Sequence, residues 1–261
     1  MWRMMIRGRS RSLWAAVSAC AVTSLAAVLL TAGPAQAAKN ESIRVIDPPT
    51  QAKLNLPMKN KDVGRYVRIM QDRLEWLGYD ISWRERVEGR YGNSTAAAVR
   101  AAQDKFYLPE TGVADKRTWT TIKNVAGDVG VLPSTCLRES KSFCIDKTAK
   151  VIRYVKNGKV DRTVDVRFGV AGLETPTGTY RVWFKWRDAT SGINGPDVPR
   201  APMPYALFFN GDIAVHYSPT FAATGYYPGG GSHGCVNVAD LQDSIYLFNQ
   251  LPAGGLVHVY W

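Results

Sequence analysis

Apolar residues follow a helical period in the first half of the chain and a strand-like pattern in the second half. Between residues 63 and 77 they recur at steps of three and four, which predicts a helix that ends at the next glycine. A second helix is predicted from Asn93 or Ser94, as its N-cap, through Phe106, and a third begins after Asp115 as its N-cap. These three short helices predict a small all-α bundle.

Beyond residue 135 the apolar segments are shorter and turn residues separate them. Two pairs of segments flank an Asn-Gly dipeptide, at 157–158 and at 210–211, which is the preferred chemistry of a tight hairpin turn. The second hairpin places His216 near the end of its returning strand. The other elements predicted here are a strand at 180–186, a helix from Asp240 to Leu251 and a last strand at 256–260. This half is therefore expected to be mainly β with a packing helix.

The first 37 residues have the layout of a signal peptide. Four arginines and no acid precede an apolar run at 13–30, and Ala35-Gln36-Ala37 provides the small-x-small pattern of a cleavage site. An uncleaved anchor is the alternative, but the Gly33-Pro34 helix breaker before the cleavage pattern argues against it. The chain is thus expected to be secreted, in the cell wall or another extracytoplasmic location, with membrane contact only during export.

Composition divides the remaining residues into segments of different character. Residues 38–53 are polar, contain two adjacent prolines and predict a flexible lead-in; residues 127–135 contain glycine and proline without periodicity and predict a linker. The expected domains are therefore 54–126 and 136–261.

The formal net charge is +11, and removal of the four arginines of the leader would leave +7. In an exported protein, this excess favours an anionic envelope polymer over nucleic acid as the charged partner.

Three cysteines remain after the leader, an odd number for an oxidising compartment. Cys136 and Cys144 are eight residues apart, a spacing that a hairpin can close, so we expect them to form a disulfide. Cys235 is left as a free thiol. Because a thiol attacks a carbonyl only as its thiolate, it needs a base nearby, and His216 is the candidate. Two histidines and a cysteine lack a fourth ligand at any familiar zinc spacing, so no metal and no cofactor are expected.

The first domain resembles the peptidoglycan-binding type 1 family. The resemblance covers residues 54–126 and departs at Ala102, where the family usually has phenylalanine; it implies binding to the wall, with a simple spacer as the alternative. It is carried by Leu77-Gly78-Tyr79, Gly89, Tyr91-Gly92, Thr95, Ala98-Val99, Gln103, Gly112 and Thr118-Trp119.

The second domain resembles the YkuD-type L,D-transpeptidases over residues 140–261. The specific signal is His216-Tyr217, then fourteen residues, then the block Ser232-His233-Gly234-Cys235-Val236-Asn237. Thr175–Tyr180 and Met203–Ala206 resemble two upstream segments of that family. Position by position, the resemblance implies Cys235 as nucleophile, His216 as base and the amides of Gly234 and Cys235 as an oxyanion hole. The residues implied in substrate binding are Ser232, His233, Asn237 and, more weakly, Tyr205.

This resemblance implies an L,D-transpeptidase that forms 3-to-3 cross-links between peptidoglycan stem peptides, with carbapenem β-lactams as inhibitors. An L,D-carboxypeptidase, with water as the acceptor, would use the same residues. A non-catalytic wall-binding protein is the other alternative. A sortase would need an arginine after the cysteine, and the last arginine of this chain is Arg200.

Overall fold

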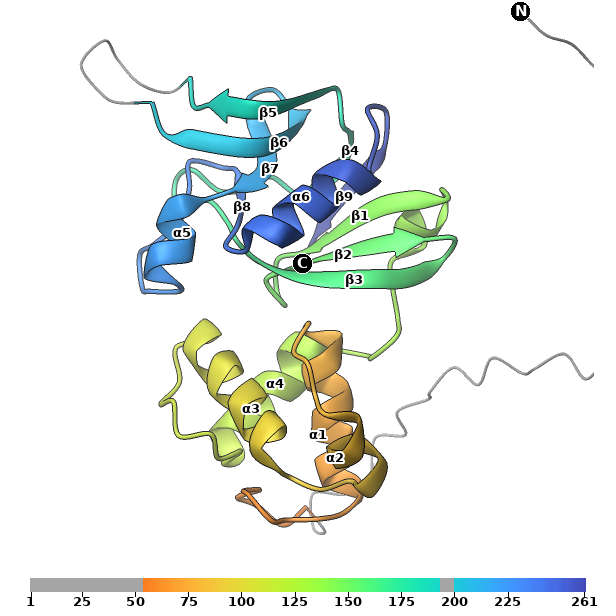
Figure 1. Ribbon diagram of the computed structural model, residues 1–261, viewed down its shortest axis with the longest axis vertical. Helices are drawn as coiled ribbons and strands as arrows, with labels where there is room; N and C mark the ends of the chain where they lie inside the picture. Colours follow the sequence, from red (N-terminus) through yellow and green to blue (C-terminus); the bar gives the residue numbers. More distant parts are fainter. Residues whose placement is uncertain (1–53, 193–199) are drawn as a thin grey trace, which may run out of the picture. The chain divides into compact units, whose positions relative to one another are not determined.

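The computed structural model describes residues 54–192 and 200–261. The expected signal peptide and lead-in, residues 1–53, lie outside the described residues. A helical region precedes a β-rich region along the chain (Figure 1). This order confirms the predicted fold class.

Four helices form the first region, one more than predicted. They are α1 (Arg65–Trp76), α2 (Trp83–Glu88), α3 (Asn93–Lys105) and α4 (Lys116–Ala126). The additional helix, α2, has no periodic apolar face, because its one buried side chain is the carboxylate Glu85. Helix α1 contacts both α3 and α4, and the side chains that fill the space between them include the fully buried Leu74, Val99 and Ile122.

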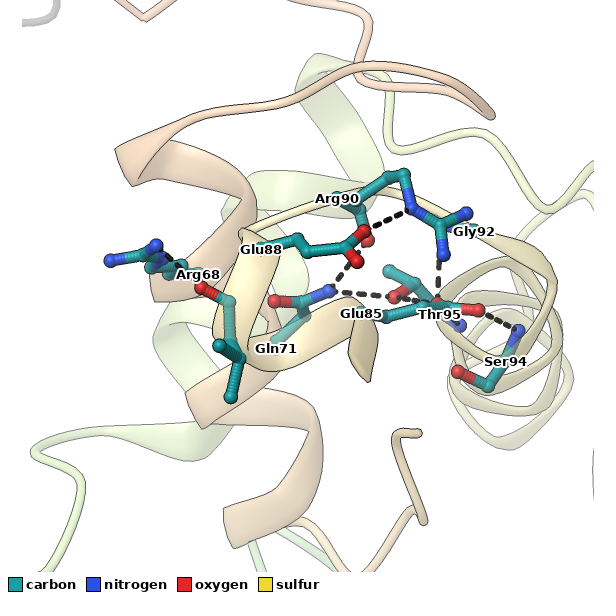
Figure 2. Close-up of polar contacts among 9 residues, drawn as sticks. Arg68, Gln71, Glu85, Glu88, Arg90, Gly92, Ser94 and Thr95 are labelled. Carbon is teal, nitrogen blue, oxygen red and sulfur yellow. Dashed lines mark hydrogen bonds and ion pairs between the residues drawn. The ribbon is translucent and has the colours of Figure 1, made fainter. Parts of the chain in front are cut away.

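The N-terminus of α3 is capped by a side chain of the preceding helix, α2. Its N-cap position is Gly92, and no side-chain hydrogen bond is made there, contrary to the expectation for Asn93 or Ser94. The carboxylate of Glu85 accepts hydrogen bonds instead from the amides of Gly92, Ser94 and Thr95, at 2.9–3.1 Å, and from the Thr95 hydroxyl at 2.7 Å (Figure 2). One carboxylate therefore satisfies three amides that a helix start leaves without partners. By contrast, Asp115 caps α4 as predicted, because its side chain accepts from the Thr118 amide.

The second region is a mixed sheet of nine strands within the described residues. The strands are β1 (Lys141–Asp146), β2 (Val151–Lys156), β3 (Lys159–Arg167), β4 (Gly178–Arg181), β5 (Phe184–Thr190), β6 (Pro202–Asn210), β7 (Ile213–Tyr217), β8 (Val236–Val238) and β9 (Leu256–Tyr260). Their order is β4-β9-β1-β2-β3-β8-β7-β6-β5, with parallel pairing at β1–β9 and at β7–β8. The order brings three segments far apart in sequence, β3, β7 and β8, side by side.

The two hairpins differ in how closely they follow the prediction. Asn157 and Gly158 both have positive φ, 50° and 75°, and connect β2 to β3 as expected of an Asn-Gly turn. In the second hairpin Asn210 still pairs with Ile213, so the turn residues are Gly211, with φ of 53°, and Asp212. The strand predicted at 180–186 is divided between β4 and β5.

Two further helices belong to this region, α5 (Pro219–Thr224) and α6 (Leu241–Gln250). Helix α6 begins as predicted, because the Asp240 side chain accepts from the Asp243 amide at 2.8 Å. Its Leu247 joins a buried core with Val236 and other apolar residues of the sheet. Since side chains alternate along a strand, the residues between these core positions lie on the opposite face. None of the helices within 54–192 and 200–261 is both long and apolar enough to cross a membrane.

Candidate active site

Three polar side chains form a row across neighbouring strands. Arg167 on β3 is paired in register with Asn237 on β8, which is paired in turn with His216 on β7. The Asn237 side-chain nitrogen lies 3.0 Å from His216 Nε2, and Arg167 Nη2 donates to Asn237 Oδ1 at 3.5 Å. All three side chains are at least nine-tenths buried. The strand order therefore assembles a polar face from residues up to 70 positions apart.

The hydrogen bonds of His216 define its tautomer. Nδ1 lies 2.6 Å from the backbone carbonyl oxygen of Tyr217, which can only accept, so Nδ1 carries the proton. Nε2 is then the acceptor for the amide of Asn237. Burial lowers the pKa of His216 to about 4, although the Tyr217 carbonyl acts in the opposite direction. The imidazole is therefore a neutral base at neutral pH.

Cys235 comes directly before β8 and is 8% exposed. Its Sγ lies 3.8 Å from the carbonyl oxygen of Asp212. Burial raises the pKa of the Cys235 thiol; a hydrogen bond from the Ala214 backbone lowers it, and the charge of Asp212 raises it. At rest Cys235 is thus a protonated thiol, and a base would have to remove its proton before the sulfur could act as a nucleophile.

The turn before Cys235 is held by hydroxyl groups. The Ser232 hydroxyl donates to the Cys235 carbonyl oxygen at 2.6 Å and accepts from the Gly234 amide at 3.1 Å. The buried Thr175 hydroxyl donates to the Gly234 carbonyl oxygen at 2.8 Å and accepts from the Gly169 amide. Gly234 itself has φ of 111°, a conformation that side chains other than glycine rarely adopt. These contacts fix the backbone that carries the thiol.

A cavity of about 630 Å³ joins these groups. Cys235, His216, Asn237 and Arg167 all contribute to its wall, as do Ser232 and the exposed His233. One side of the cavity is aromatic: Trp183, Phe184 and Trp186 are 44–60% exposed there and stack or meet edge to edge. Apolar walls with a few convergent polar groups are typical of binding sites for organic substrates.

The structure brings most of the residues expected at the site together, but not all. Tyr205 is absent from the cavity wall: its ring packs edge-on against Phe248 of α6, 5.7 Å between centroids. The reason is local, because Tyr205 has φ of 58° and so interrupts the side-chain alternation of β6. The Gly234 amide, expected in an oxyanion hole, donates to Ser232 here. Cys136 and Cys144 are joined by a disulfide, with 5.8 Å between their Cα atoms.

The sequence did not predict Arg167 as a site residue, although this residue lies in the cavity wall. Only its place as the last residue of a strand could have drawn attention to it. Within the described ranges, no group of three or more histidine, cysteine, aspartate or glutamate side chains is clustered as metal ligands would be.

Two protein-family models match this chain. Residues 140–259 match the family model of the L,D-transpeptidase catalytic domain, and residues 64–122 match that of a putative peptidoglycan binding domain. No curated protein matches the sequence.

Among solved structures, the chain is similar to an L,D-transpeptidase from Stackebrandtia nassauensis, at 25% identity and a TM-score of 0.52, over 79% of this chain and 98% of that one. It is also similar to an L,D-transpeptidase from Xylanimonas cellulosilytica, at 26% identity and a TM-score of 0.43, over 82% of this chain and 100% of that one. L,D-transpeptidase 3 from Mycobacterium tuberculosis, solved with a faropenem-derived adduct, matches at 21% identity and a TM-score of 0.40, over 47% of this chain and 60% of its own. The chain therefore carries a cysteine-dependent L,D-transpeptidase catalytic domain, preceded by a domain of the peptidoglycan-binding family.

Proposed function

We propose that this protein is an exported L,D-transpeptidase that forms 3-to-3 cross-links between peptidoglycan stem peptides through a thioester on Cys235. The observation that carries the proposal is that Cys235 and the neutral base His216 line one cavity in a domain of this family. Both domains are of types that act on peptidoglycan, which is consistent with an extracytoplasmic location. The helical domain holds the enzyme on the polymer, and residues 1–37 direct its export.

In the acylation step, Cys235 Sγ forms a bond to the carbonyl carbon of the third residue of a donor stem, a diamino acid. The thiol proton passes to His216 Nε2, which is the free acceptor of the ring once Nδ1 donates to Tyr217. This requires the Asn237 amide to turn away from Nε2 as the substrate enters. The bond to the terminal D-alanine then breaks, and its amine takes the proton from His216.

In the second step, the side-chain amine of another stem attacks the thioester. A proton of that amine passes through His216 to the departing sulfur, so that the free thiol is regenerated and one amide bond has been exchanged for another. The amides of Gly234 and Cys235 stabilise the oxyanion in both steps; the Gly234 amide must then exchange Ser232 Oγ for the oxyanion.

Treatment of the purified protein with a carbapenem tests the nucleophile. We expect one adduct per chain, located at Cys235 by peptide mass spectrometry and lost in Cys235→Ala. If the unaltered protein forms no adduct, or forms it at another residue, the proposal is wrong. Incubation with disaccharide tetrapeptides then identifies the acceptor, because transpeptidation gives a cross-linked dimer, whereas an L,D-carboxypeptidase gives only the tripeptide and free D-alanine.

A further inference from the structure

Arg167 is a buried cation that has no anionic partner within residues 54–192 and 200–261. Its side chain is 5% exposed, and no carboxylate among the residues that the structure describes forms an ion pair with it. Removing a guanidinium from water is unfavourable unless an anion or a full set of acceptors replaces the lost hydration. A buried, unpaired guanidinium in a cavity wall therefore indicates a binding site for an anionic ligand.

The hydrogen bonds of Arg167 leave most of its donors available. Nη1 donates to the Thr224 hydroxyl at 3.4 Å and Nη2 to Asn237 Oδ1 at 3.5 Å, both at the long limit for such a bond. Nε is buried and has no partner among the described residues. A guanidinium has five N–H donors in one plane, so these two long hydrogen bonds leave most of its donors without an acceptor.

Aromatic rings supply the other contacts of Arg167. The guanidinium carbon lies 4.7 Å from the ring centroid of Phe221 and 5.9 Å from that of Tyr227. A cation–π contact stabilises the charge on one face of the guanidinium but leaves its in-plane N–H groups without acceptors. The rings thus hold the group in place and leave its hydrogen-bonding edge for a ligand.

The distance between Arg167 and His216 limits which part of the substrate Arg167 can bind. It lies in the wall of the same cavity as Cys235, and two strand spacings, about 10 Å, separate its backbone from that of His216. An extended peptide advances about 3.5 Å per residue. The guanidinium itself lies closer, because only the amide group of Asn237 separates it from His216 Nε2, with contacts of 3.5 and 3.0 Å. A substrate group held by Arg167 therefore lies within about three residues of the reacting carbonyl.

We propose that Arg167 binds a carboxylate of the donor stem peptide and so selects the donor. The inference rests on the proposed function. A planar guanidinium fork matches a carboxylate by two parallel hydrogen bonds, which a neutral amide cannot reproduce. The two residues that flank the scissile bond can each carry a free carboxylate: that of the terminal D-alanine and, when the third residue is diaminopimelate and is not amidated, its second carboxyl group.

Four synthetic tetrapeptide donors test this inference: one with both carboxylates free, one amidated at the third residue, one amidated at the terminal D-alanine, and one amidated at both. Acylation is followed as kcat/KM from the peptide products by mass spectrometry. With the unaltered protein, we expect one of the two amidations to lower kcat/KM by at least about 30-fold, and it identifies the carboxylate bound. Arg167→Gln should lower kcat/KM for the free donor by a similar factor and then respond little to either amidation.

Two arginines serve as matched controls. Arg162 lies on the same strand, is exposed and pairs with Asp243, so Arg162→Gln should retain the full preference. Arg200 is the other arginine among the described residues of the cavity wall, but it is exposed, so Arg200→Gln should retain the preference as well. If the preference disappears in Arg200→Gln and survives in Arg167→Gln, the inference is wrong.

A structural role for Arg167 gives a different result. Arg167→Gln would then lower kcat/KM for all four donors by one factor, together with the midpoint of thermal unfolding, and this outcome overturns the inference. Equal rates on the four donors with the unaltered protein would also overturn it, while leaving the transpeptidase function intact. If the unaltered protein releases D-alanine or its amide from no donor, the proposed function itself fails.

Discussion

Glu85 and Arg167 are both buried charged side chains, but their hydrogen bonding is opposite. The carboxylate of Glu85 accepts four hydrogen bonds of 2.7–3.1 Å from the start of α3 (Figure 2). The guanidinium of Arg167 makes two bonds of 3.4 and 3.5 Å and keeps one buried nitrogen without a partner. The first charge is fully satisfied within the helical domain, and the second is not satisfied within the catalytic domain.

This difference separates a polar group that stabilises the fold from one that serves a ligand. Burial raises the pKa of Glu85, but the hydrogen bonds from Thr95 and Ser94 outweigh it and lower the pKa to about 2. The network thus favours the charged carboxylate. For His216, burial is the larger effect, and the single Tyr217 carbonyl does not compensate for it. Substitutions at Glu85 and its hydrogen-bond donors should therefore lower stability, whereas substitutions in the row formed by His216, Asn237 and Arg167 should lower activity.

The largest effect is expected from His216→Ala. Loss of the base should slow carbapenem acylation of Cys235 by at least about 100-fold, because the thiol is protonated at rest and must lose its proton. Time-resolved intact mass measures the rate, and His258→Ala is the control, because His258 lies against Thr179 at 2.9 Å on another strand. An unchanged rate in His216→Ala would require another base.

Glu85→Gln should have the reverse profile. The amide cannot accept from all four donors, so the free energy of unfolding should fall by about 2 kcal/mol, or about 30-fold in the folded-to-unfolded ratio, with no change in acylation rate. Denaturant unfolding followed by circular dichroism measures this. Glu88→Gln is the control, because Glu88 is half exposed and, among the residues that the structure describes, its ion pair is with Arg90.

The pH dependence of the Glu85 effect has a definite sign. Because the folded pKa, about 2, is below the ordinary value of 4.5, the stabilisation is complete above pH 4.5 and is lost as pH falls towards 2. The difference between the unaltered protein and Glu85→Gln should shrink over that interval. A difference that stays constant down to pH 2 would show that the carboxylate charge is not responsible.

The fold class and the catalytic-domain family could be predicted from the sequence because their signals are local. Apolar spacing located α1 and α6, and the six-residue block around Cys235 identified the catalytic domain. The cap of α3 could not be predicted, since Glu85 precedes its donors by seven to ten residues and lies on a helix without an apolar face. The cap was therefore predicted among the adjacent residues, Asn93 and Ser94, and not at Glu85.

Arg167 could not be predicted for a different reason. Its neighbours Asn237 and His216 become adjacent only through the order β3-β8-β7, in which a parallel pair lies beside an antiparallel one. No local pattern in the sequence determines that order. Tyr205 was expected in the pocket from the resemblance of residues 203–206 to a segment of the family, and that motif does not reveal the positive φ of Tyr205 or the packing of its ring against Phe248.

The smallest effect concerns the pH dependence of acylation, and it tests whether His216 is as poorly satisfied as its contacts indicate. With a pKa of about 4, the imidazole is already neutral at pH 5.5, so the acylation rate should change by less than about twofold between pH 5.5 and 7.5 and fall only towards pH 4. Asn237→Asp sharpens the test, because a carboxylate beside Nε2 favours the imidazolium and should move this fall to higher pH. Single-turnover acylation at each pH measures both profiles. A rise centred near the ordinary value of 6.5 in the unaltered protein would contradict the prediction and place His216 in a more polar setting than the row with Asn237 and Arg167 provides.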